Sequence, residues 1–595
     1  NATNPSTGQS VAADLRRLIV RGGDLDGNVD IDGDLGVVRV LRGQVGPFST
    51  IRAGRDARSI MVTGSGSPLV AGDVDIEGDL TSLVVTRRST TPSAAMTGDL
   101  DVGGKLRRAS IRGGDMNGSI TAGTPGATDD ALGLLLVSAD LNGSVDVNGD
   151  GSRIIVRGST WAPINVNGGD LNVLNVTNRG GSTLNAPVEV EGRLGRAILV
   201  GTTNASIEAG SSGNAGAGAI IARGGAPGGV TVHGDLRSVI VVGGELGGID
   251  VNNGDLNVLR VINRSSDAVT GPVNVDGRLR IASIIGNVTS PVDVENSLGS
   301  FMLRGDLNGA LDVNGDARSI SVFNGSIGSA SPVTIHGNLT RMSVLDRSAG
   351  AAIESDIQVD GRLNSFRVSG GDFTADLTAG DIGRATYRTQ NGLTNNLTSN
   401  TDLGALVVVP SGGQAMSSSA SLDVNNSMRR ALFRGNVRGD ISIGSGQSED
   451  GAGSILITGD FDATGGPNPD MNIDGDLRRI QVNGNFEADT SPDADLSARN
   501  LGTLSVRGNL SNAFVDVENE TRNVRVTGDY TNSRIQSDRL GRVVLRGNVQ
   551  GQPEDPDDRV SSVGDEFSLI VEGRWRRIRP GEPPFTTNDV TFEAV

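Results

Sequence analysis

The chain has 595 residues and a formal net charge of −18, and it contains 87 glycines but no cysteine. The absence of cysteine excludes disulfides, thiolate metal sites and cysteine nucleophiles, and the two histidines leave little room for histidine-based catalysis. The acidic balance argues against nucleic acid as a partner, because phosphate binding needs a basic surface, and no apolar run reaches the roughly 18 residues that a membrane span needs.

A short phrase, Val-Asp-Ile-Asp-Gly-Asp-Leu, recurs along the chain. It stands at 29–35 and, in varied form, at 74–80, 145–150, 188–194, 273–279, 311–316 and 471–477. The apolar stretch that opens each copy, such as Val29-Asp30-Ile31, reads as its first strand. Marking the last apolar residue of this strand gives about 24 copies between Ile31 and Ile535, with a mean spacing of about 22 residues. A unit of this size cannot bury its apolar side alone, so successive copies must stack on one another.

Each copy predicts two or three short strands that end at Gly, Asn or Asp, and no stretch combines helical periodicity with caps. The sequence therefore predicts an all-β fold, a single long parallel β-solenoid with one turn per repeat. Residues 1–13 are a tail or cap, 14–552 are the repeats, and 553–595 are a C-terminal cap or docking strand. In the phrase Gly-Asp-Leu we expect Gly to turn the chain, Asp to bond backbone amides at the corner, and Leu to point inward.

The C-terminal segment contains apolar residues that suit a strand. A solenoid has an open edge at each end, and this edge must be capped or paired with another molecule. One interpretation makes both tails caps. The other makes one tail a strand that docks on the next subunit, with Trp575, Val590, Phe592 and Val595 as the candidate assembly residues.

The strongest metal motif is Asp146-Val147-Asn148-Gly149-Asp150-Gly151, which matches the opening of a Ca²⁺ loop. Its twelfth position is Arg157 instead of a carboxylate, so Asp146, Asn148 and Asp150 are weak candidates and we expect a structural role. His233 and His336 occupy the same phase of the repeat, which predicts solvated corner residues.

Enzymes of the β-helix type need a tight carboxylate cluster in a cleft. The adjacent pair Asp129 and Asp130 lacks the other motifs of such enzymes. We therefore expect no enzymatic activity, no catalytic residues and no cofactor, with bound Ca²⁺ as the alternative.

The central residue of each first strand is predicted to face outward and to form an acidic stripe along the solenoid. Its members are Asp30, Asp75, Asp101, Asp146, Glu189, Asp250, Asp293, Asp312, Asp423 and Asp516, and other turns carry Asn, Thr, Ser or Gln at this position. The outward positions of the second strand are predicted to be Arg39, Arg260, Arg367 and Arg525 mixed with Val84, Ile155, Leu199, Met302 and Val544. Either these rows neutralise one another within one molecule, or the acidic face packs against the Arg and apolar face of another copy. Ca²⁺ bridging through Asp30, Asp75, Asp293 and Asp312 is a further alternative.

The Gly-Asp-Leu phrasing, the abundance of Asp, Asn, Val, Ser and Thr, and the missing Cys resemble bacterial secreted β-solenoid surface proteins over residues 14–550. These proteins include haemagglutinin-like adhesins and planctomycete-type surface repeat proteins. The resemblance implies a secreted protein of the cell surface.

We therefore predict an extracellular structural protein that self-assembles head to tail into a filament, fibre or sheath, with lateral contacts in addition. A cell-surface adhesin or spacer that contacts polysaccharide or another cell surface is the alternative. A polysaccharide-active enzyme is a third. Neither nucleic acid nor membrane insertion is expected.

Overall fold

The computed structural model describes residues 13–89, 93–126, 129–211, 215–346, 350–444, 451–462, 470–488, 494–552 and 558–595. The regular elements in these stretches are all β-strands, and no helix that could cross a membrane occurs in them. The strands form a parallel β-solenoid of about 24 turns, which confirms the predicted fold class. By its internal contacts the chain divides into two units, 1–297 and 298–595, each built from the same kind of turn.

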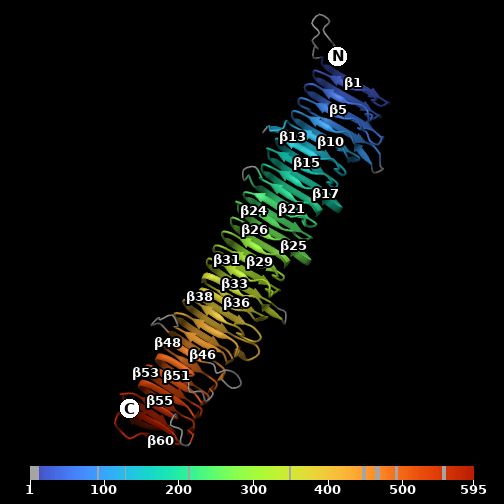
Figure 1. The fold of residues 1–595 in the computed structure, drawn as a ribbon. Helices are drawn as coiled ribbons and strands as arrows, with labels where there is room; N and C mark the ends of the chain where they lie inside the picture. Colours follow the sequence, from blue (N-terminus) through green and yellow to red (C-terminus); the bar gives the residue numbers. More distant parts are fainter. Residues whose placement is uncertain are drawn as a thin grey trace. The chain divides into compact units, whose positions relative to one another are not determined.

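Every turn of unit 1 contributes one strand to each of two parallel sheets (Figure 1). The first-strand sheet contains β2 (Val29–Ile31), β4 (Ile51–Ala53), β6 (Val74–Ile76), β9 (Leu100–Val102), β12 (Ile120–Ala122), β14 (Val145–Asn148), β16 (Ile164–Asn167), β18 (Val188–Val190), β20 (Ile207–Ala209), β22 (Val230–His233), β24 (Ile249–Asn252), β26 (Val273–Val275) and β28 (Val292–Val294). The second-strand sheet contains β1 (Leu15–Arg21), β3 (Leu35–Leu41), β5 (Ala57–Gly64), β7 (Leu83–Arg87), β10 (Leu106–Arg112), β13 (Asp130–Val137), β15 (Asp150–Val156), β17 (Leu171–Leu184), β19 (Leu194–Thr203), β21 (Ala217–Arg223), β23 (Leu236–Val242), β25 (Leu256–Val269) and β27 (Leu279–Val288). A third side consists mainly of single bridges, with β8 (Ala94–Met96) and β11 (Asp115–Met116) as its strands.

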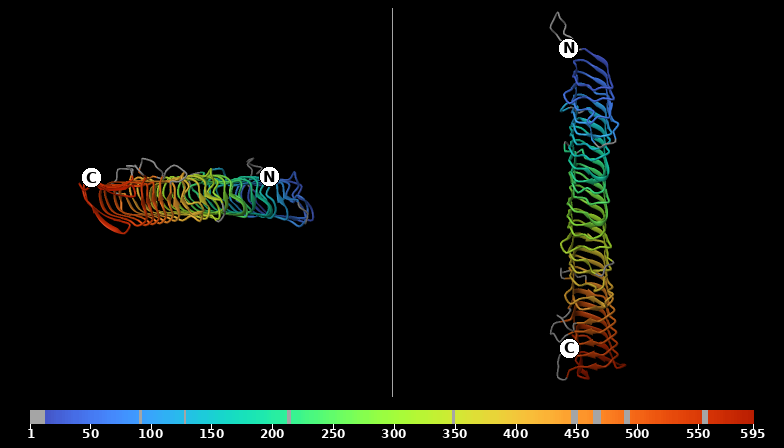
Figure 2. Two further views of the ribbon diagram at one scale, coloured as in Figure 1. Left: turned by 90° about the horizontal axis from the view of Figure 1, so that it is seen from below. Right: turned by 90° about the vertical axis from the view of Figure 1, so that its right-hand side faces the viewer.

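Unit 2 repeats this plan, and its turns follow one another in chain order from yellow to red in Figure 2. Its first-strand sheet contains β30 (Leu311–Val313), β32 (Val333–Ile335), β35 (Ile357–Leu363), β38 (Leu377–Arg388), β39 (Leu397–Ser399), β42 (Ser421–Val424), β45 (Asp440–Ile443), β48 (Met471–Leu477), β51 (Leu496–Val506), β53 (Phe514–Val526), β55 (Arg534–Leu545), β57 (Arg559–Ser562), β60 (Phe585–Thr587) and β61 (Val590–Ala594). Its second-strand sheet contains β29 (Leu298–Arg304), β31 (Ala317–Phe323), β33 (Leu339–Leu345), β36 (Phe366–Ser369), β40 (Leu403–Val408), β43 (Met428–Phe433), β46 (Ala452–Ile457), β49 (Ile480–Val482), β58 (Phe567–Val571) and β59 (Arg574–Ile578). The long strands β38, β51, β53 and β55 continue around the corner into this second sheet.

The third side of unit 2 is more regular than that of unit 1. Its strands are β34 (Ala351–Ile353), β37 (Asp372–Phe373), β41 (Gln414–Met416), β44 (Asn436–Val437), β47 (Phe461–Asp462), β50 (Phe486–Glu487), β52 (Leu510–Ser511), β54 (Tyr530–Thr531) and β56 (Val549–Gln550). Aromatic rings fill the core beside these strands. Phe366, Phe373 and Tyr387 lie 5.6–5.7 Å apart between ring centroids, and Phe461 and Phe486 lie 4.7 Å apart. Rings at these distances make favourable tilted contacts, so each turn supports the next.

Aspartates at the corners join successive turns by hydrogen bonds. The backbone N–H of Asp170 donates to Oδ1 of Asp150 at 2.8 Å, and the N–H of Arg193 donates to Oδ1 of Asp170 at 2.7 Å. In unit 2 the N–H of Arg362 donates to Oδ1 of Asn338 at 2.9 Å. The predicted bond from a corner Asp to a backbone amide is thus confirmed, and its donor is the equivalent residue one turn later. Asn serves equally well because its side-chain oxygen has the same reach.

The glycine before the corner residue is required by the close approach of two turns. A Cβ at Gly169, in the phrase Gly169-Asp170-Leu171, would lie 2.4 Å from the carbonyl oxygen of Gly149, which no side chain tolerates. The Gly in Gly-Asp-Leu therefore allows turns to stack as closely as a β-sheet demands.

The solenoid begins and ends differently. Among the described residues, β1 pairs only with β3 and β2 only with β4. At the other end β61 pairs in parallel with β57 on one side and antiparallel with β60 on the other. In the second-strand sheet β59 pairs antiparallel with β58. The stretch 558–595 therefore adds two antiparallel strands, β59 and β60, to the parallel strands of unit 2.

Candidate functional site: the charged faces of the turns

The predicted acidic stripe of unit 1 is one column of outward residues on the first-strand sheet, interrupted by Thr and Asn as expected and by Arg52, which was not expected. In order of the turns the column reads Asp30, Arg52, Asp75, Asp101, Thr121, Asp146, Asn165, Glu189, Glu208, Thr231, Asp250, Asn274 and Asp293. Glu208 is an acidic member that the sequence reasoning missed. Its strand ends in Ala209 and departs from the repeated phrase, which hid its phase.

Most interruptions of this column supply hydrogen-bond or charge partners. The Arg52 guanidinium lies 3.8 Å from Asp30, 3.6 Å from Asp75 and 2.5 Å from Glu77. Asn165 donates to Asp146 at 2.7 Å, and Asn274 donates to Asp250 at 2.6 Å. Neutral donors one turn away relieve the repulsion that stacked carboxylates would suffer.

Asp101 shows what happens without such a donor. It stacks directly on Asp75. Partial burial, and after it the charge of Asp75, raises the pKa of the Asp101 carboxyl. The charged form of this carboxylate therefore opposes folding to a small extent.

Unit 2 carries fewer acids in the same column. Between β30 and β55 the column holds Asp312, Asp423 and Asp516 among Thr, Gln, Ser and Asn residues. His336 lies one position after its strand, with Nδ1 2.8 Å from Asp360 and Nε2 3.5 Å from Asp312. A hydrogen bond from Gln358, followed by the one from His336, lowers the pKa of Asp360.

The candidate Ca²⁺ ligands do not converge. Asp146 accepts a hydrogen bond from Asn165, whereas Asn148 donates to the carbonyl of Gly123 and Asp150 accepts from the backbone of the next turn. No group of three His, Cys, Asp or Glu side chains arranged to hold a metal occurs in the described part of the chain. The role of Asp30, Asp75, Asp293 and Asp312 as metal ligands stays a prediction.

The acidic pair Asp129 and Asp130 and the histidine His233, also singled out in the sequence, lie beside polar residues of neighbouring turns. The Asp130 carboxylate lies 2.6 Å from Nζ of Lys105, while Asp129 is exposed. His233 lies 3.1 Å from Glu208. Each of these groups contacts a neighbouring turn, as corner residues do.

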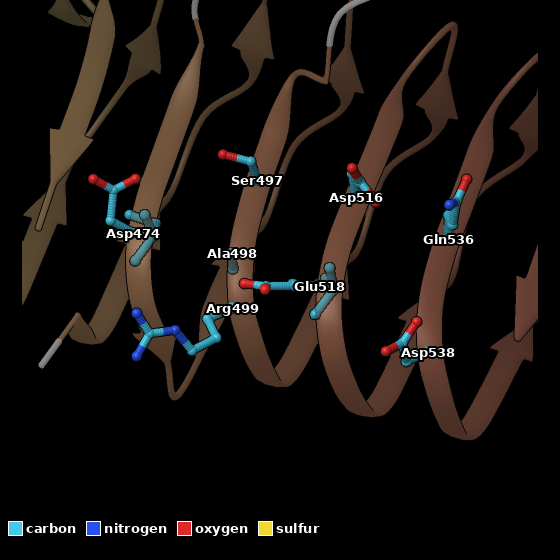
Figure 3. A pocket seen from close by; sticks show the side chains of 10 residues that line it. Asp474, Ser497, Ala498, Arg499, Asp516, Glu518, Gln536 and Asp538 are labelled. Carbon is cyan, nitrogen blue, oxygen red and sulfur yellow. The ribbon is translucent and has the colours of Figure 1, made fainter. Parts of the chain in front are cut away.

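One acidic hollow lies on the first-strand side of unit 2. It has a volume of about 690 Å³ and is formed where β48, β51, β53 and β55 follow one another. Four carboxylates line it, from Asp474, Asp516, Glu518 and Asp538, together with the cation of Arg499. Figure 3 shows Glu518 extending toward the turn that carries Ala498 and Arg499. Sequence reasoning identified only Asp516, because the other acids lie just past the central position of their strands.

The second-strand face of unit 2 is basic. Its arginines are Arg304, Arg341, Arg367, Arg384, Arg388, Arg430, Arg434, Arg479, Arg507, Arg525, Arg542 and Arg546, all exposed. The outward columns from β29 to β55 contain no Asp or Glu. The predicted outward positions of Arg367 and Arg525 are confirmed.

The second-strand face of unit 1 combines arginine with aliphatic residues. Val242 and Ile281 on this face are 38% and 39% exposed. The prediction that Leu199 belongs here is wrong, because Leu199 is fully buried and its neighbour Ile198 takes the outward position beside Asn175. A phase error of one residue in a strand exchanges the two faces.

The four candidate assembly residues fall into two groups. Val590 and Phe592 are fully buried within their own unit, where β61 pairs with β57 and β60. Trp575 and Val595 are 66% and 69% exposed. The side chains accessible for a contact between copies are therefore Trp575 and Val595, and their role in assembly stays a prediction.

No protein-family model, no curated protein and no solved structure matches this chain significantly.

Proposed function

We propose that this protein is an extracellular structural protein whose copies join end to end through the edges of the solenoid that no described strand covers. The observation that carries the proposal is the state of the first turn. Leu18 and Val20 of β1 and Ile31 of β2 occupy core columns but are only half-buried, whereas their partners Val38, Val40 and Ala53 one turn later are fully buried. Apolar side chains and unpaired backbone groups at a sheet edge are a template for a further strand.

The charges of the end strands select which edges fit. β1 carries Arg16, Arg17 and Arg21, and β59 carries Arg574, Arg576 and Arg577. These edges repel each other, because like charges directly opposite are destabilising. Charged residues on β59 are also the usual protection of an edge against pairing.

The outer edges of the first-strand sheet, β2 at one end and β60 at the other, do not carry like charges and can pair. β60, with the sequence Phe-Thr-Thr, has no charge and pairs only with β61 among the described strands. The Arg576 guanidinium lies over the Phe585 ring, 3.9 Å from its centroid. The edge of β2 carries Asp30, so we propose that β2 of one copy pairs with β60 of the next. The resemblance to secreted surface solenoids supports the extracellular location.

The test compares self-association of the full chain and two single variants. Ile31→Asp places a carboxylate at the half-buried core position of β2, the strand proposed to pair with the next copy, and Ile19→Asp adds the same charge at an outward position of β1 as the control. Analytical ultracentrifugation and electron microscopy are expected to show concentration-dependent chains of copies for the wild type and the control, and their loss in Ile31→Asp. A wild-type protein that stays monomeric at high concentration, with and without Ca²⁺, would refute the proposal.

A surface adhesin is the second candidate function. The exposed arginines of unit 2 favour it, because the outward strand columns of this face contain no Asp or Glu in the part of the chain that the structure describes and are available for a partner of opposite charge. Variants that lose binding to such a partner but keep the oligomeric state of the wild type would favour the adhesin over the structural protein.

A further inference from the structure

Arginine recurs at every second turn in one outward column of unit 2. The register places Arg384 beside Ala405 and Arg430 beside Ser454. Extended in both directions, the column reads Arg341, Ser365, Arg384, Ala405, Arg430, Ser454 and Arg479. Adjacent strands lie about 4.8 Å apart, so the arginines of this column recur about every 10 Å.

These cations are not neutralised within the described part of the chain. None of the arginines in this column lies within ion-pair distance of a carboxylate there, and the one polar side-chain contact recorded for them joins Arg479 to Gln481 at 2.6 Å. The interpretation that neighbouring rows neutralise one another therefore does not hold for this face. A row of cations that protein carboxylates leave free is the electrostatic footprint of an anionic ligand.

Two adjoining hollows lie between the arginines. The first has a volume of about 360 Å³ and is lined by Arg341, Arg367, Arg384 and Arg388 with hydroxyl-bearing side chains between them. The second has a volume of about 570 Å³ and shares Arg388. Its lining also contains Arg434 and the aliphatic side chains of Val407, Val409 and Leu432. Cations at the margins and an apolar floor suit a ligand that is anionic at intervals and has flat apolar surfaces between its charges.

We propose that this arginine ladder binds an acidic polysaccharide lengthwise, one anionic group at every second turn. An extended polysaccharide advances by a similar distance over two sugar residues, so a chain with one carboxylate or sulfate per disaccharide matches the ladder. The planar guanidinium binds either group through two parallel hydrogen bonds. This inference goes beyond the end-to-end structural role and does not depend on it.

Two other polyanions fit the face less well. Nucleic acid on a sheet is usually held by aromatic side chains that stack on the bases, and the outward columns from β33 to β49 contain none. The acidic column of a second copy has the right spacing, but its carboxylates already have donors such as Arg52, Asn165 and Asn274 in their own unit.

The test uses the full chain and an end-labelled hyaluronan oligosaccharide, which carries a carboxylate on every second sugar. The test variant combines Arg384→Ser and Arg430→Ser, since serine occupies the intervening turns of the same column. The control variant combines Arg429→Ser and Arg478→Ser, which remove two exposed arginines at a corner beside the ladder. Affinity is measured by fluorescence anisotropy at several salt concentrations, with dextran and single-stranded DNA as comparison ligands.

We expect the wild type to bind hyaluronan and not dextran, with affinity that falls as salt rises. Loss of two exposed ion pairs is expected to weaken binding about tenfold in the test variant, and the control variant is expected to bind like the wild type. The proposal is overturned if the wild type does not bind hyaluronan, if both variants lose affinity equally, or if DNA binds more tightly. It is also overturned if the test variant loses self-association in sedimentation, because the ladder would then hold a second copy.

Discussion

The corner hydrogen bonds offer the sharpest test of how the turns are joined. We call each such bond between a corner side chain and the backbone N–H of the next turn a rung. In one rung the Asp170 carboxylate accepts a hydrogen bond from the N–H of Arg193 at 2.7 Å. Asp170→Ala removes this acceptor, while Asp170→Asn keeps an oxygen in its place, as Asn338 does naturally one rung before Arg362. Because the rung is solvent-exposed, we expect a cost at the low end for a hydrogen bond, about 1 kcal/mol in the alanine variant, and little cost in the asparagine variant.

Global unfolding is not the appropriate measurement, because repeat proteins lose stability locally and are not two-state. Hydrogen–deuterium exchange with mass spectrometry of the peptide containing Arg193 reports on the rung itself. A loss of about 1 kcal/mol predicts exchange about five times faster in Asp170→Ala. The peptide containing Arg278, whose N–H is held by Asp255 at 2.7 Å, is the internal control. Equal exchange in wild type and Asp170→Ala, or equal acceleration in both variants, would show that the side-chain oxygen does not hold the turns together.

Further predictions concern buried hydroxyls and carboxylates. The Tyr387 hydroxyl is buried without a hydrogen-bond partner among the described residues, whereas the Tyr530 hydroxyl donates to a backbone carbonyl at 2.6 Å. Tyr387→Phe is therefore expected to stabilise its own turns against local unfolding and Tyr530→Phe to destabilise its own, each by about 1 kcal/mol; changes of the same sign in hydrogen–deuterium exchange of the two peptides would contradict this. Asp101→Asn is expected to stabilise unit 1 by about 0.5 kcal/mol at neutral pH, because an amide can donate to Asp75 where a carboxylate repels it. Since the pKa of Asp101 is raised, this gain should shrink as acidification protonates the wild-type carboxyl. A gain that is independent of pH, measured by hydrogen–deuterium exchange of the peptide that contains residue 101 against the wild type at each pH, would exclude the charge as its cause. The pKa of Asp360 is lowered, so its contribution to stability is fully present above the ordinary carboxyl pKa and is lost as the pH falls through the lowered value. Asp360→Asn should therefore destabilise its part of unit 2 at pH 7 and match the wild type in strong acid, as hydrogen–deuterium exchange of the peptide that contains residue 360, compared with the wild type at each pH, can check.

Much of the local structure was predictable because each turn repeats the same physical problem. The alternation of apolar and polar residues in Val145-Asp146-Val147 indicates a strand with one buried face, and the structure buries both valines completely. The corner phrase Gly-Asp-Leu predicts a turn, a backbone hydrogen bond and an inward leucine, and all three are present at 169–171, where Asp170 accepts the N–H of Arg193 and Leu171 is fully buried. The faces were harder to assign in long strands. There two outward residues can stand side by side, and the phase at Leu199 was misjudged for that reason.

The candidate surfaces were predicted only in part. The sequence showed that acids favour the first strand and arginines the second. It did not show that Arg52 and Asn165 relieve the acidic column, since these residues become neighbours of the acids only when turns stack. The hollows between Arg341 and Arg434 were likewise beyond reach, because they depend on which side chains are small in adjacent turns.

The composition of a single turn thus decides its strands, its corners and its inward residues, since these depend on chain conformation and local polarity. Which turns' residues meet is decided by stacking. Asp146 and Asn165 are 19 residues apart, whereas Asp440 and Asp470 are 30 apart, yet each pair is joined by a hydrogen bond between adjacent turns. Loops of unequal length leave a turn and return without changing the register of the strands, because the backbone hydrogen bonds of the sheet fix that register. The charge columns and the arginine ladder are consequences of this register, and they exist only in the folded molecule.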